Sequence, residues 1–327
     1  MERVYFTLAA FLAAYILDYL VGDPRSWPHP VRLLGRIIEI GEGAVRRLFK
    51  SPAGLKVGGG LILLLTGLGS VVLVITLLRL AYLLHPAAGF IIETYIIFTT
   101  LAGGDLRSHV LAVENKLARA DLPAARGAVA LLVSRDTSEL DENGVARAAL
   151  ESLFENSADG LVAPLFYTAI GGPAAAVLYK TVNTLDSMLG YKTEELKDIG
   201  FFAAKTDDIL SFIPARLTAF YIVLAGLLHG KWQRGVRVLM ADRNRHQSPN
   251  SAWPMAAAAG VLGVSFGGRD YFRGDVIERP RINAAGKAAL GSDINRGLNL
   301  FRLTSILALI TMLLLTYWIR ILEVVIF

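Results

Sequence analysis

The chain has 327 residues, of which 54% are apolar, and its mean hydropathy is +0.49, well above that of a soluble globular protein. The net charge of +5 agrees with the excess of Lys and Arg in cytoplasmic loops of membrane proteins. No basic stretch is interleaved with aromatic residues, so a nucleic-acid partner is not expected. The absence of cysteine excludes disulfides, thiolate nucleophiles, iron–sulfur ligation and cysteine zinc sites.

Several hydrophobic segments approach the roughly 20 residues that a helix needs to cross a bilayer. The sequence therefore predicts an all-α fold, a polytopic helical membrane protein in one integral-membrane domain over residues 1–327. The first span is expected to be retained, because Met1-Glu2-Arg3 lacks the net positive charge of a signal peptide. Clear spans lie near residues 4–21, 57–84, 87–101 and 303–327, and partial or interrupted spans lie near 161–179, 209–229 and 253–266.

The polar segments between the spans indicate which side of the membrane they face. Residues 22–56 and 230–252 carry more Lys and Arg than Asp and Glu, which places them in the cytoplasm. Residues 103–160 return to the same side and are long enough for several amphipathic helices. Within them, Asp121 is expected to cap a helix that has Pro123 in its first turn.

Two proline motifs predict breaks in the apolar segments. His85-Pro86 marks the turn of a helical hairpin, because proline cannot continue a helix. Gly171-Gly172-Pro173 predicts a kinked or re-entrant pair of half-helices within 161–179. The sequence leaves open whether 161–179 and 209–229 cross fully or double back. A single catalytic face requires that they double back.

Polar residues are dense between Glu151 and Arg216, beside apolar sequence of membrane-spanning length. A carboxylate in such a place is costly unless it faces a cavity, a partner charge or a metal ion. Glu151, Glu155 and Asp159 recur every four residues, so a helix would place all three on one face. They would then need a cation, a metal or protonation to coexist, unless they form a solvated helix face.

A second carboxylate group follows. Asn183 and Asp186 share a helix face, and Asp207-Asp208 comes next. Adjacent aspartates could supply one Mg²⁺ ligand and one supporting group, since Mg²⁺ commonly takes one or two carboxylates plus phosphate oxygens. The simpler alternative is that they cap a helix beginning at Ile209.

Two proline-rich loops complete the candidate regions. Residues 22–32 contain His29 and Arg32, although composition alone favours a structural turn there. Residues 242–254 hold a histidine, a hydroxyl and an amide in an extended loop suited to an anionic or amide-rich ligand. No phosphate-binding loop is visible, because Gly230-Lys231-Trp232 and Gly286-Lys287-Ala288 lack the Ser/Thr and the upstream glycine of a Walker A motif.

In combination and in order, these motifs resemble the integral-membrane adenosylcobinamide-phosphate synthases of cobalamin biosynthesis, the CobD/CbiB family. The resemblance runs from Asp18 to about Tyr271. It departs from the family at Ala252 and Met255, where the family has a glycine and a glutamate, so Met255 receives no role. The motifs are Gly22-Asp23-Pro24, Pro28-His29-Pro30-Val31-Arg32, Gly35, Arg135-Asp136-Thr137, Glu151-Ser152, Glu155-Asn156, Asp159-Gly160, Asn183-Thr184-Leu185-Asp186-Ser187-Met188, Asp207-Asp208, Pro214-Ala215-Arg216 and His246-Gln247-Ser248-Pro249-Asn250.

The resemblance implies a ligase that joins adenosylcobyric acid to aminopropanol phosphate, or to a related amino-alcohol phosphate, with ATP and Mg²⁺. It implies a multi-pass protein of the cell (inner) membrane with a cytoplasmic active face, in contact with the lipid bilayer and compatible with an oligomer. The metal ligands are assigned as Asp207 and Asp208. Catalytic roles in charge stabilisation and proton transfer are assigned to Glu155, Asp159, Lys180, Asp186 and Arg216. Substrate binding is assigned to His29, Arg32, Arg135, Asn156, Asn183, His246, Ser248 and Asn250.

Two other functions remain open. An intramembrane, Mg²⁺-dependent transferase acting on a lipid diphosphate would also use aspartates on facing helices, but the usual Asp-Asp-x-x-Asp spacing is missing. A transporter would fit the broken helix at Gly171-Gly172-Pro173, but most polar motifs lie in loops. The sequence does not fix the amino alcohol, the nucleotide site or the oligomeric state.

Overall fold

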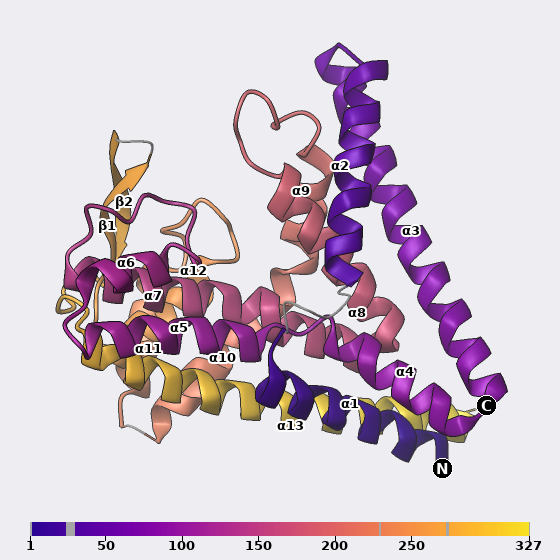
Figure 1. Cartoon of the computed structure of the whole chain (residues 1–327). Coiled ribbons are helices and arrows are strands. Elements are labelled where there is room, and N and C mark those ends of the chain that lie inside the picture. The colour runs from indigo at the N-terminus through magenta and orange to yellow at the C-terminus, as the bar shows by residue number, and fades with distance from the viewer. Residues whose placement is uncertain (1, 24–29, 229, 273–274, 327) are drawn as a thin grey trace. The chain divides into compact units, whose positions relative to one another are not determined.

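The computed structural model describes residues 2–23, 30–228, 230–272 and 275–326 (Figure 1). It is mostly helical, which confirms the predicted fold class. A small antiparallel hairpin, β1 with β2, is the exception that the sequence did not predict. The elements are α1 (Glu2–Val21), α2 (Pro30–Leu48), α3 (Pro52–Leu84), α4 (Pro86–Phe98), α5 (Gly103–Leu117), α6 (Leu122–Val129), α7 (Glu142–Ser157), the π-helix η1 (Ala158–Val162), α8 (Ala163–Leu189), α9 (Phe201–Leu210), α10 (Phe212–Leu227), α11 (Trp232–Asp242), α12 (Ala252–Leu262), β1 (Phe266–Phe272), β2 (Asp275–Ile282) and α13 (Gly291–Ile326).

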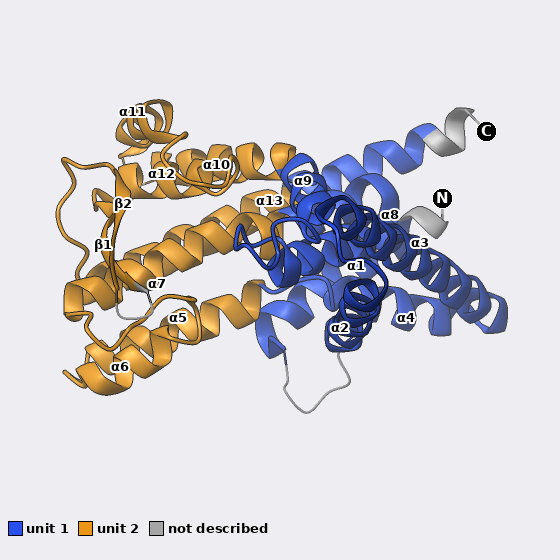
Figure 2. Cartoon of the chain, turned by 90° about the horizontal axis from the view of Figure 1, so that it is seen from above, with its two compact units in different colours: residues 1–102, 163–211, 311–327 blue, residues 103–162, 212–310 orange. Residues whose placement is uncertain are grey.

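The chain forms two compact units, which Figure 2 shows in different colours. Unit 1 consists of residues 1–102, 163–211 and 311–327, and unit 2 consists of residues 103–162 and 212–310. The chain passes from one unit to the other four times, so neither unit is a continuous piece of sequence. The single integral-membrane domain stays a prediction, and each unit is described separately below.

Three helical stretches of the described chain are long and apolar enough to cross a membrane: Pro52–Leu84, Glu142–Leu189 and Gly291–Leu322. The number rises to five if α4 with α5, and α9 with α10, each form one broken span. These stretches confirm the predicted multi-pass helical character. The apolar stretch of α1, and α12, are shorter than a full span.

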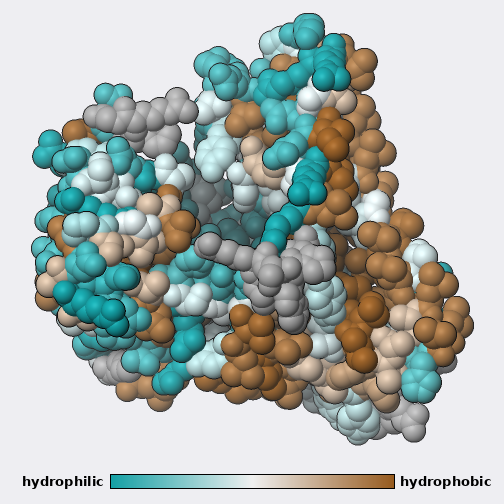
Figure 3. Space-filling view, viewed as in Figure 1, coloured by the Kyte–Doolittle hydropathy of each residue, from teal (hydrophilic) through white to brown (hydrophobic). Residues whose placement is uncertain are grey.

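Helix α3 carries much of the exposed apolar surface of unit 1, and Figure 3 shows hydrophobic residues along it. Only 17% of its most apolar window is buried within the protein. Such an apolar surface is stable in contact with lipid tails. A helix can lie there because all of its backbone hydrogen bonds are internal. The exposed side chains include Val57, Leu61, Leu64, Leu65, Leu68, Val72, Leu73, Leu80, Leu83 and Leu84.

The apolar faces of α2, α3, α8 and α9 meet in one core of unit 1. Helix α2 is amphipathic and turns its buried residues toward α3 and α8. This core fixes the last turns of α8 and the first turns of α9, which carry the polar residues discussed below. The buried members are Ile38, Val45, Ile62, Leu185, Leu189, Ile199 and Ala203.

Both predicted breaks are present in unit 1. Gly172 interrupts α8 with φ 68° and ψ −164°, a conformation open to glycine, and Pro173 follows it. His85 ends α3 and caps α4, since its Nδ1 accepts a hydrogen bond of 3.1 Å from the backbone N–H of Ala87. The predicted helix start at Ile209 is wrong, because Asp207 and Asp208 lie inside α9 rather than at its N-terminus.

Helix α12 packs against α7, α10 and α11 within unit 2. All of its residues except Trp253 are buried. Its alanines and Gly260 let neighbouring backbones approach closely, as small residues do in membrane helices. The predicted cap of α6 is confirmed, because Asp121 Oδ1 accepts a 3.0 Å hydrogen bond from the N–H of Ala124.

Gly59→Ala should destabilise unit 1. A Cβ at position 59 would lie 1.8 Å from the carbonyl oxygen of Ile199, so α3 would have to move away from the segment before α9. Overpacking of this kind costs about 1–3 kcal/mol. A lower midpoint of thermal unfolding in detergent would show the effect.

Gly69→Ala on the same helix is the matched control. Nothing lies within 4 Å of an added Cβ there, and alanine favours a helix over glycine by about 1 kcal/mol. Its unfolding midpoint should stay the same or rise. Equal destabilisation by both substitutions would contradict the close approach at Gly59.

Candidate functional site

The predicted site residues fall into both units. Lys180, Asn183 and Asp186 lie on α8, and Asp207 and Asp208 lie on α9, all in unit 1. These five residues are called the carboxylate cluster here. Helices α8 and α9 pack against each other, so residues 20 to 30 positions apart in sequence become neighbours.

Asp207 is the buried member of the carboxylate cluster, with 7% of its surface exposed. Asn183 Nδ2 donates a hydrogen bond of 3.2 Å to Asp207 Oδ1, and Ser211 Oγ donates one of 3.4 Å to Oδ2. The hydroxyl of Tyr179 lies 3.2 Å from Ser211 Oγ. Both oxygens of Asp207 therefore have neutral donors, which is how a protein holds a buried carboxylate.

Asp186 and Asp208 have a different environment. Both are half-buried, and their carboxylates are close enough to repel each other electrostatically. Lys205 Nζ lies 4.0 Å from Asp208 Oδ2. Asp186 Oδ1 also lies against Gly190, where an added Cβ would come within 1.8 Å of it. The pair of carboxylates attracts a cation.

The carboxylate cluster could hold Mg²⁺ only if phosphate oxygens and water supply the remaining ligands. No group of three or more acidic or histidine side chains among the described residues could hold a metal ion alone. Two carboxylates are enough when phosphate oxygens and water supply the other ligands. Asp208 with Asp186 suits this arrangement better than Asp208 with Asp207, because the oxygens of Asp207 already accept hydrogen bonds.

Two further predicted residues, His29 and Arg32, come from the first proline-rich segment of the sequence, residues 22–32. Arg32 is exposed on the first turn of α2, and its Nη2 lies 3.7 Å from Asp23 Oδ1. His29 lies outside the described residues. The substrate-binding role assigned to the two residues stays a prediction.

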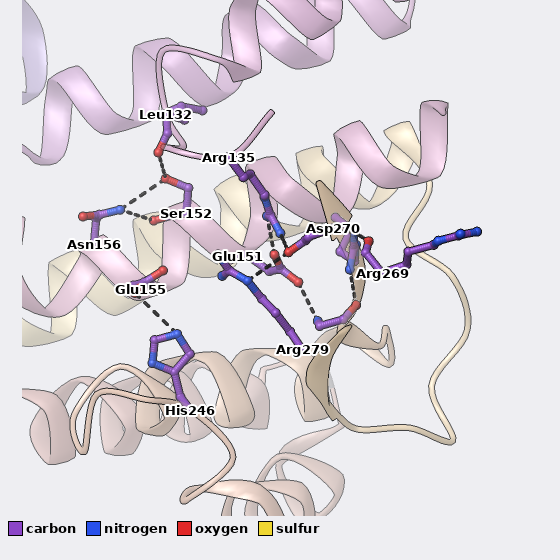
Figure 4. Close-up of polar contacts among 12 residues, drawn as sticks. Leu132, Arg135, Glu151, Ser152, Glu155, Asn156, His246, Arg269, Asp270 and Arg279 are labelled. Atoms are coloured by element: carbon purple, nitrogen blue, oxygen red, sulfur yellow. Dashed lines mark hydrogen bonds and ion pairs between the residues drawn. The ribbon is translucent and has the colours of Figure 1, made fainter. Parts of the chain in front are cut away.

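In unit 2, Arg135 lies in a buried ion-pair network with Glu151 of α7 and Asp270 of β1 (Figure 4). Arg135 Nη2 donates a 2.5 Å hydrogen bond to Glu151 Oε2, and Nη1 donates to Asp270 Oδ2. Asp270 also accepts a 2.7 Å hydrogen bond from Arg147 and lies 3.0 Å from Arg279 Nε. Arg135 thus joins α7 to β1 within unit 2, and the substrate-binding role expected of it stays a prediction.

The network also explains the position of the β-hairpin. Glu151 Oε1 accepts a 2.6 Å hydrogen bond from the N–H of Gly267, and Arg147 Nη2 donates one of 2.8 Å to the carbonyl of Arg269. Burial alone lowers the pKa of Arg135, but the charges of Glu151 and Asp270 outweigh it and raise that pKa above its ordinary value. The cation expected beside Glu151 is therefore Arg135.

Glu155 lies one turn after Glu151 but faces a different partner. Its Oε1 lies 3.8 Å from His246 Nε2, and both side chains are partly exposed. His246 Nδ1 accepts a 3.1 Å hydrogen bond from the N–H of Ser248. A neutral His246 therefore carries its proton on Nε2, toward Glu155 (Figure 4).

Asn156 and Asp159 do not extend the predicted acidic face. Asn156 Nδ2 donates 2.9 Å and 3.2 Å hydrogen bonds back to the carbonyl and the Oγ of Ser152. Asp159 lies in the π-helix η1, where a wider turn changes the phase of the helix. A regular i, i+4, i+8 face is therefore limited to Glu151 and Glu155.

Arg216 and Asn250 form a third contact in unit 2. Arg216 Nη1 donates a 2.6 Å hydrogen bond to Asn250 Oδ1, and its guanidinium stacks over the rings of Phe212 and Trp253 at 3.6 Å and 4.5 Å. Ser248 Oγ accepts from the N–H of Asn250 at 3.3 Å. The predicted residues of the second proline-rich loop are thus brought together with Arg216.

Sequence reasoning missed Arg147, Asp270 and Arg279. Asp270 lies 135 positions after Arg135, so no local spacing connects the two. Arg147 could have been found from the sequence, because it lies four residues before Glu151 and would share its face of a helix.

Arg135→Met should destabilise unit 2, since Glu151 would lose its buried cationic partner. Removing one partner of a buried ion pair costs about 3–5 kcal/mol. Thermal unfolding and limited proteolysis of the purified protein would measure the loss. Arg119→Met, an exposed cation of the same unit, should change stability by less than about 0.5 kcal/mol. An unchanged stability of Arg135→Met, together with weaker substrate binding, would return Arg135 to the predicted substrate-binding role.

The family model described as "CobD/Cbib protein" matches residues 11–301 of this chain. The cobalamin biosynthesis protein CobD of Klebsiella pneumoniae is 41% identical over 319 residues, covering 95% of this chain and 98% of that protein. CbiB of Salmonella typhimurium is 39% identical over 304 residues, covering 93% and 95%. CobD of Listeria monocytogenes serovar 1/2a is 40% identical over 311 residues, covering 93% and 96%.

No solved structure matches the chain. The family model and the relatives each extend over nearly its whole length, including the carboxylate cluster and the Arg135 network. The chain therefore belongs to the CobD/CbiB family.

Proposed function

We propose that this protein is an ATP-dependent amide ligase of cobalamin biosynthesis. It joins the free propionate of adenosylcobyric acid to the amine of aminopropanol phosphate, which gives adenosylcobinamide phosphate. The observation that carries the proposal is the carboxylate cluster, in a chain that aligns almost end to end with cobalamin biosynthesis proteins. Its apolar helices support a multi-pass membrane protein. We place it in the cell membrane with the active face in the cytoplasm, because residues 22–56 and 230–252 carry more Lys and Arg than Asp and Glu.

The first step of the proposed reaction activates the corrinoid carboxylate. A carboxylate oxygen attacks the γ-phosphorus of ATP, ADP leaves, and an acyl phosphate forms. Mg²⁺ held by Asp208 and Asp186 would neutralise negative charge on the phosphate oxygens. Asp207 acts as a positioning residue, because its hydrogen bond fixes the amide of Asn183 on the neighbouring helix. Lys180 lies one turn before Asn183 and supplies positive charge to the phosphoryl group.

The second step forms the amide bond. The amine nitrogen attacks the acyl carbon, inorganic phosphate leaves, and the nitrogen loses a proton. Glu155 is the proposed acceptor of that proton, because it is partly exposed and its carboxylate lies 3.8 Å from Nε2 of His246, which can orient it. Asp159 is the other candidate. His246, Ser248 and Asn250, together with Arg32 and His29, are proposed to bind corrinoid amides or the amino-alcohol phosphate, and Arg216 to steady anionic charge.

The direct test is product formation by the purified protein. It is incubated with adenosylcobyric acid, aminopropanol phosphate and Mg-ATP, and the products are analysed by mass. The proposal requires the amide product together with ADP and phosphate in equal amounts. Transfer from a lipid diphosphate, or substrate movement across vesicles without any amide, would support the two other functions instead.

Asp208→Asn should lower the coupling rate by roughly 100-fold or more, as the loss of a metal-site contact does. The fold should persist, because the substitution keeps the size of the side chain. Asp198→Asn is the matched control, since Asp198 belongs to the same unit but pairs with Lys56 at 3.4 Å. Wild-type turnover by Asp208→Asn would remove Asp208 from the metal site.

Glu155→Gln should lower the rate and change its dependence on pH. Glutamine keeps the shape of the side chain but cannot accept the proton that the amine nitrogen loses. Loss of general-base catalysis typically costs about 10²- to 10⁴-fold. Glu114→Gln is the control, because Glu114 bonds to Asn295 elsewhere in unit 2. An unchanged rate and pH profile would eliminate Glu155 as the base.

A further inference from the structure

Unit 2 contains a pocket of about 540 Å³ that none of the assigned catalytic or substrate-binding residues lines. It is formed by α11, the end of α12, the segment after β2 and the beginning of α13. A smaller cavity of about 150 Å³ shares three of its residues, Lys231, Leu262 and Arg296. The lining residues with positive charge are Lys231, Arg234, Arg237, Lys287 and Arg296.

The pocket is strongly cationic. No carboxylate is among its described lining residues. The carboxylate that meets its cations is Asp293, which is 1% exposed and lies behind them. Lys287 Nζ lies 2.8 Å from Asp293 Oδ2, and Arg296 Nη1 lies 2.7 Å from Oδ1. One buried carboxylate leaves the lining with a large excess of positive charge.

Several of these side chains are held in place before any ligand binds. Arg234 donates hydrogen bonds of 2.5 Å and 3.2 Å to the carbonyls of Gly260 and Val261. Arg296 Nη2 donates one of 3.1 Å to the carbonyl of Leu262. Gly263, with φ 77°, leaves room for the Arg234 guanidinium, because an added Cβ would lie 2.3 Å from Nη2. This arrangement reduces the entropy that a ligand must overcome.

Capping of α12 explains only part of the cluster. Arginines near the last carbonyls of a helix are favourable, and this accounts for Arg234 and Arg296. It does not account for Lys231 and Arg237, whose side chains make no hydrogen bond or ion pair within the described part of the chain. The charge of Arg296, more than burial or the charge of Arg234, lowers the pKa of Lys231 below its ordinary value. A bound anion would relieve this repulsion.

The pocket lies where apolar helices of unit 2 end. Helix α10 ends at Leu227 and α12 at Leu262, and the apolar helix α13 begins at Gly291. Helix α11 exposes Trp232 and Met240, eight positions apart on one face, while its arginines line the pocket. Such an amphipathic helix is typical of a membrane interface, where basic pockets attract lipid phosphates.

We propose that this pocket binds a phosphate group, supplied either by a soluble phosphate ester or by the headgroup of an anionic phospholipid. Arginine and lysine together suit it, because Arg offers paired donors and Lys a mobile point charge. The proposal goes beyond the ligase reaction and does not depend on it.

The test compares the wild type with the double variant Lys231→Gln/Arg237→Gln, which removes the two cations that no other side chain uses. Lys116→Gln/Arg119→Gln is the matched control, with the same charge change in the same unit. One arm titrates inorganic phosphate and glycerol phosphate into the full-length protein in detergent by calorimetry. The other measures lipid retention and thermal stability in phosphatidylcholine nanodiscs with and without phosphatidic acid.

If the pocket takes a soluble ligand, the wild type should bind the soluble phosphates, and the double variant should bind them about 25-fold more weakly, at roughly fivefold per cation. The same loss seen only with phosphatidic acid would support it with a lipid ligand. In both cases the control variant should behave like the wild type. The proposal would be overturned by equal binding in wild type and double variant, by equal loss in the control, or by no binding in either arm. Unchanged circular dichroism of both variants would separate lost binding from lost folding.

Discussion

The ion pairs of Arg135 hold together the polar part of unit 2. A buried carboxylate in a largely apolar protein loses its hydration, and it is stable only if charged or hydrogen-bonded partners replace the water. Arg135 gives that replacement to Glu151 and Asp270 at once, and Asp270 also contacts Arg147 and Arg279. These contacts tie α7 to β1, and Glu155, one turn further along α7, lies beside His246.

The need of a buried carboxylate for partners also divides the aspartates of the carboxylate cluster into two kinds. Asp207 receives neutral donors from Asn183 and Ser211, so its charge can remain buried without a metal ion. Asp186 and Asp208 are half-buried and close enough for their like charges to repel each other. Two carboxylates in this state favour a divalent cation, and a cation bound by only two of them keeps open positions for phosphate oxygens. Substrate phosphate would then complete the metal site, which suits a reaction that consumes ATP.

Local patterns in the sequence predicted the local features well. Apolar length predicted the long helices, and Gly171-Gly172-Pro173 predicted the break that the structure has at Gly172. The β-hairpin was missed, because β1 contains two adjacent glycines, β2 contains a proline, and neither strand alternates apolar with polar residues. The pairing of Arg135 with Asp270 was also missed, since a contact across 135 positions leaves no periodic trace. The π-helix at Asp159 changed the helix phase, which a fixed period of 3.6 residues cannot anticipate.

The cationic pocket shows why a search for phosphate-binding loops can fail on a chain that binds phosphate. A Walker A loop concentrates its donors in eight consecutive residues, whereas the pocket draws its cations from positions 231 to 296. Lys231 and Lys287 each follow a glycine, and each lacks the rest of the motif. In the folded unit both lie in the same pocket, with Asp293 orienting one of them. Side-chain cations on separate helices can provide the charge that a loop provides with its backbone, and only the packing of α11, α12 and α13 brings them together.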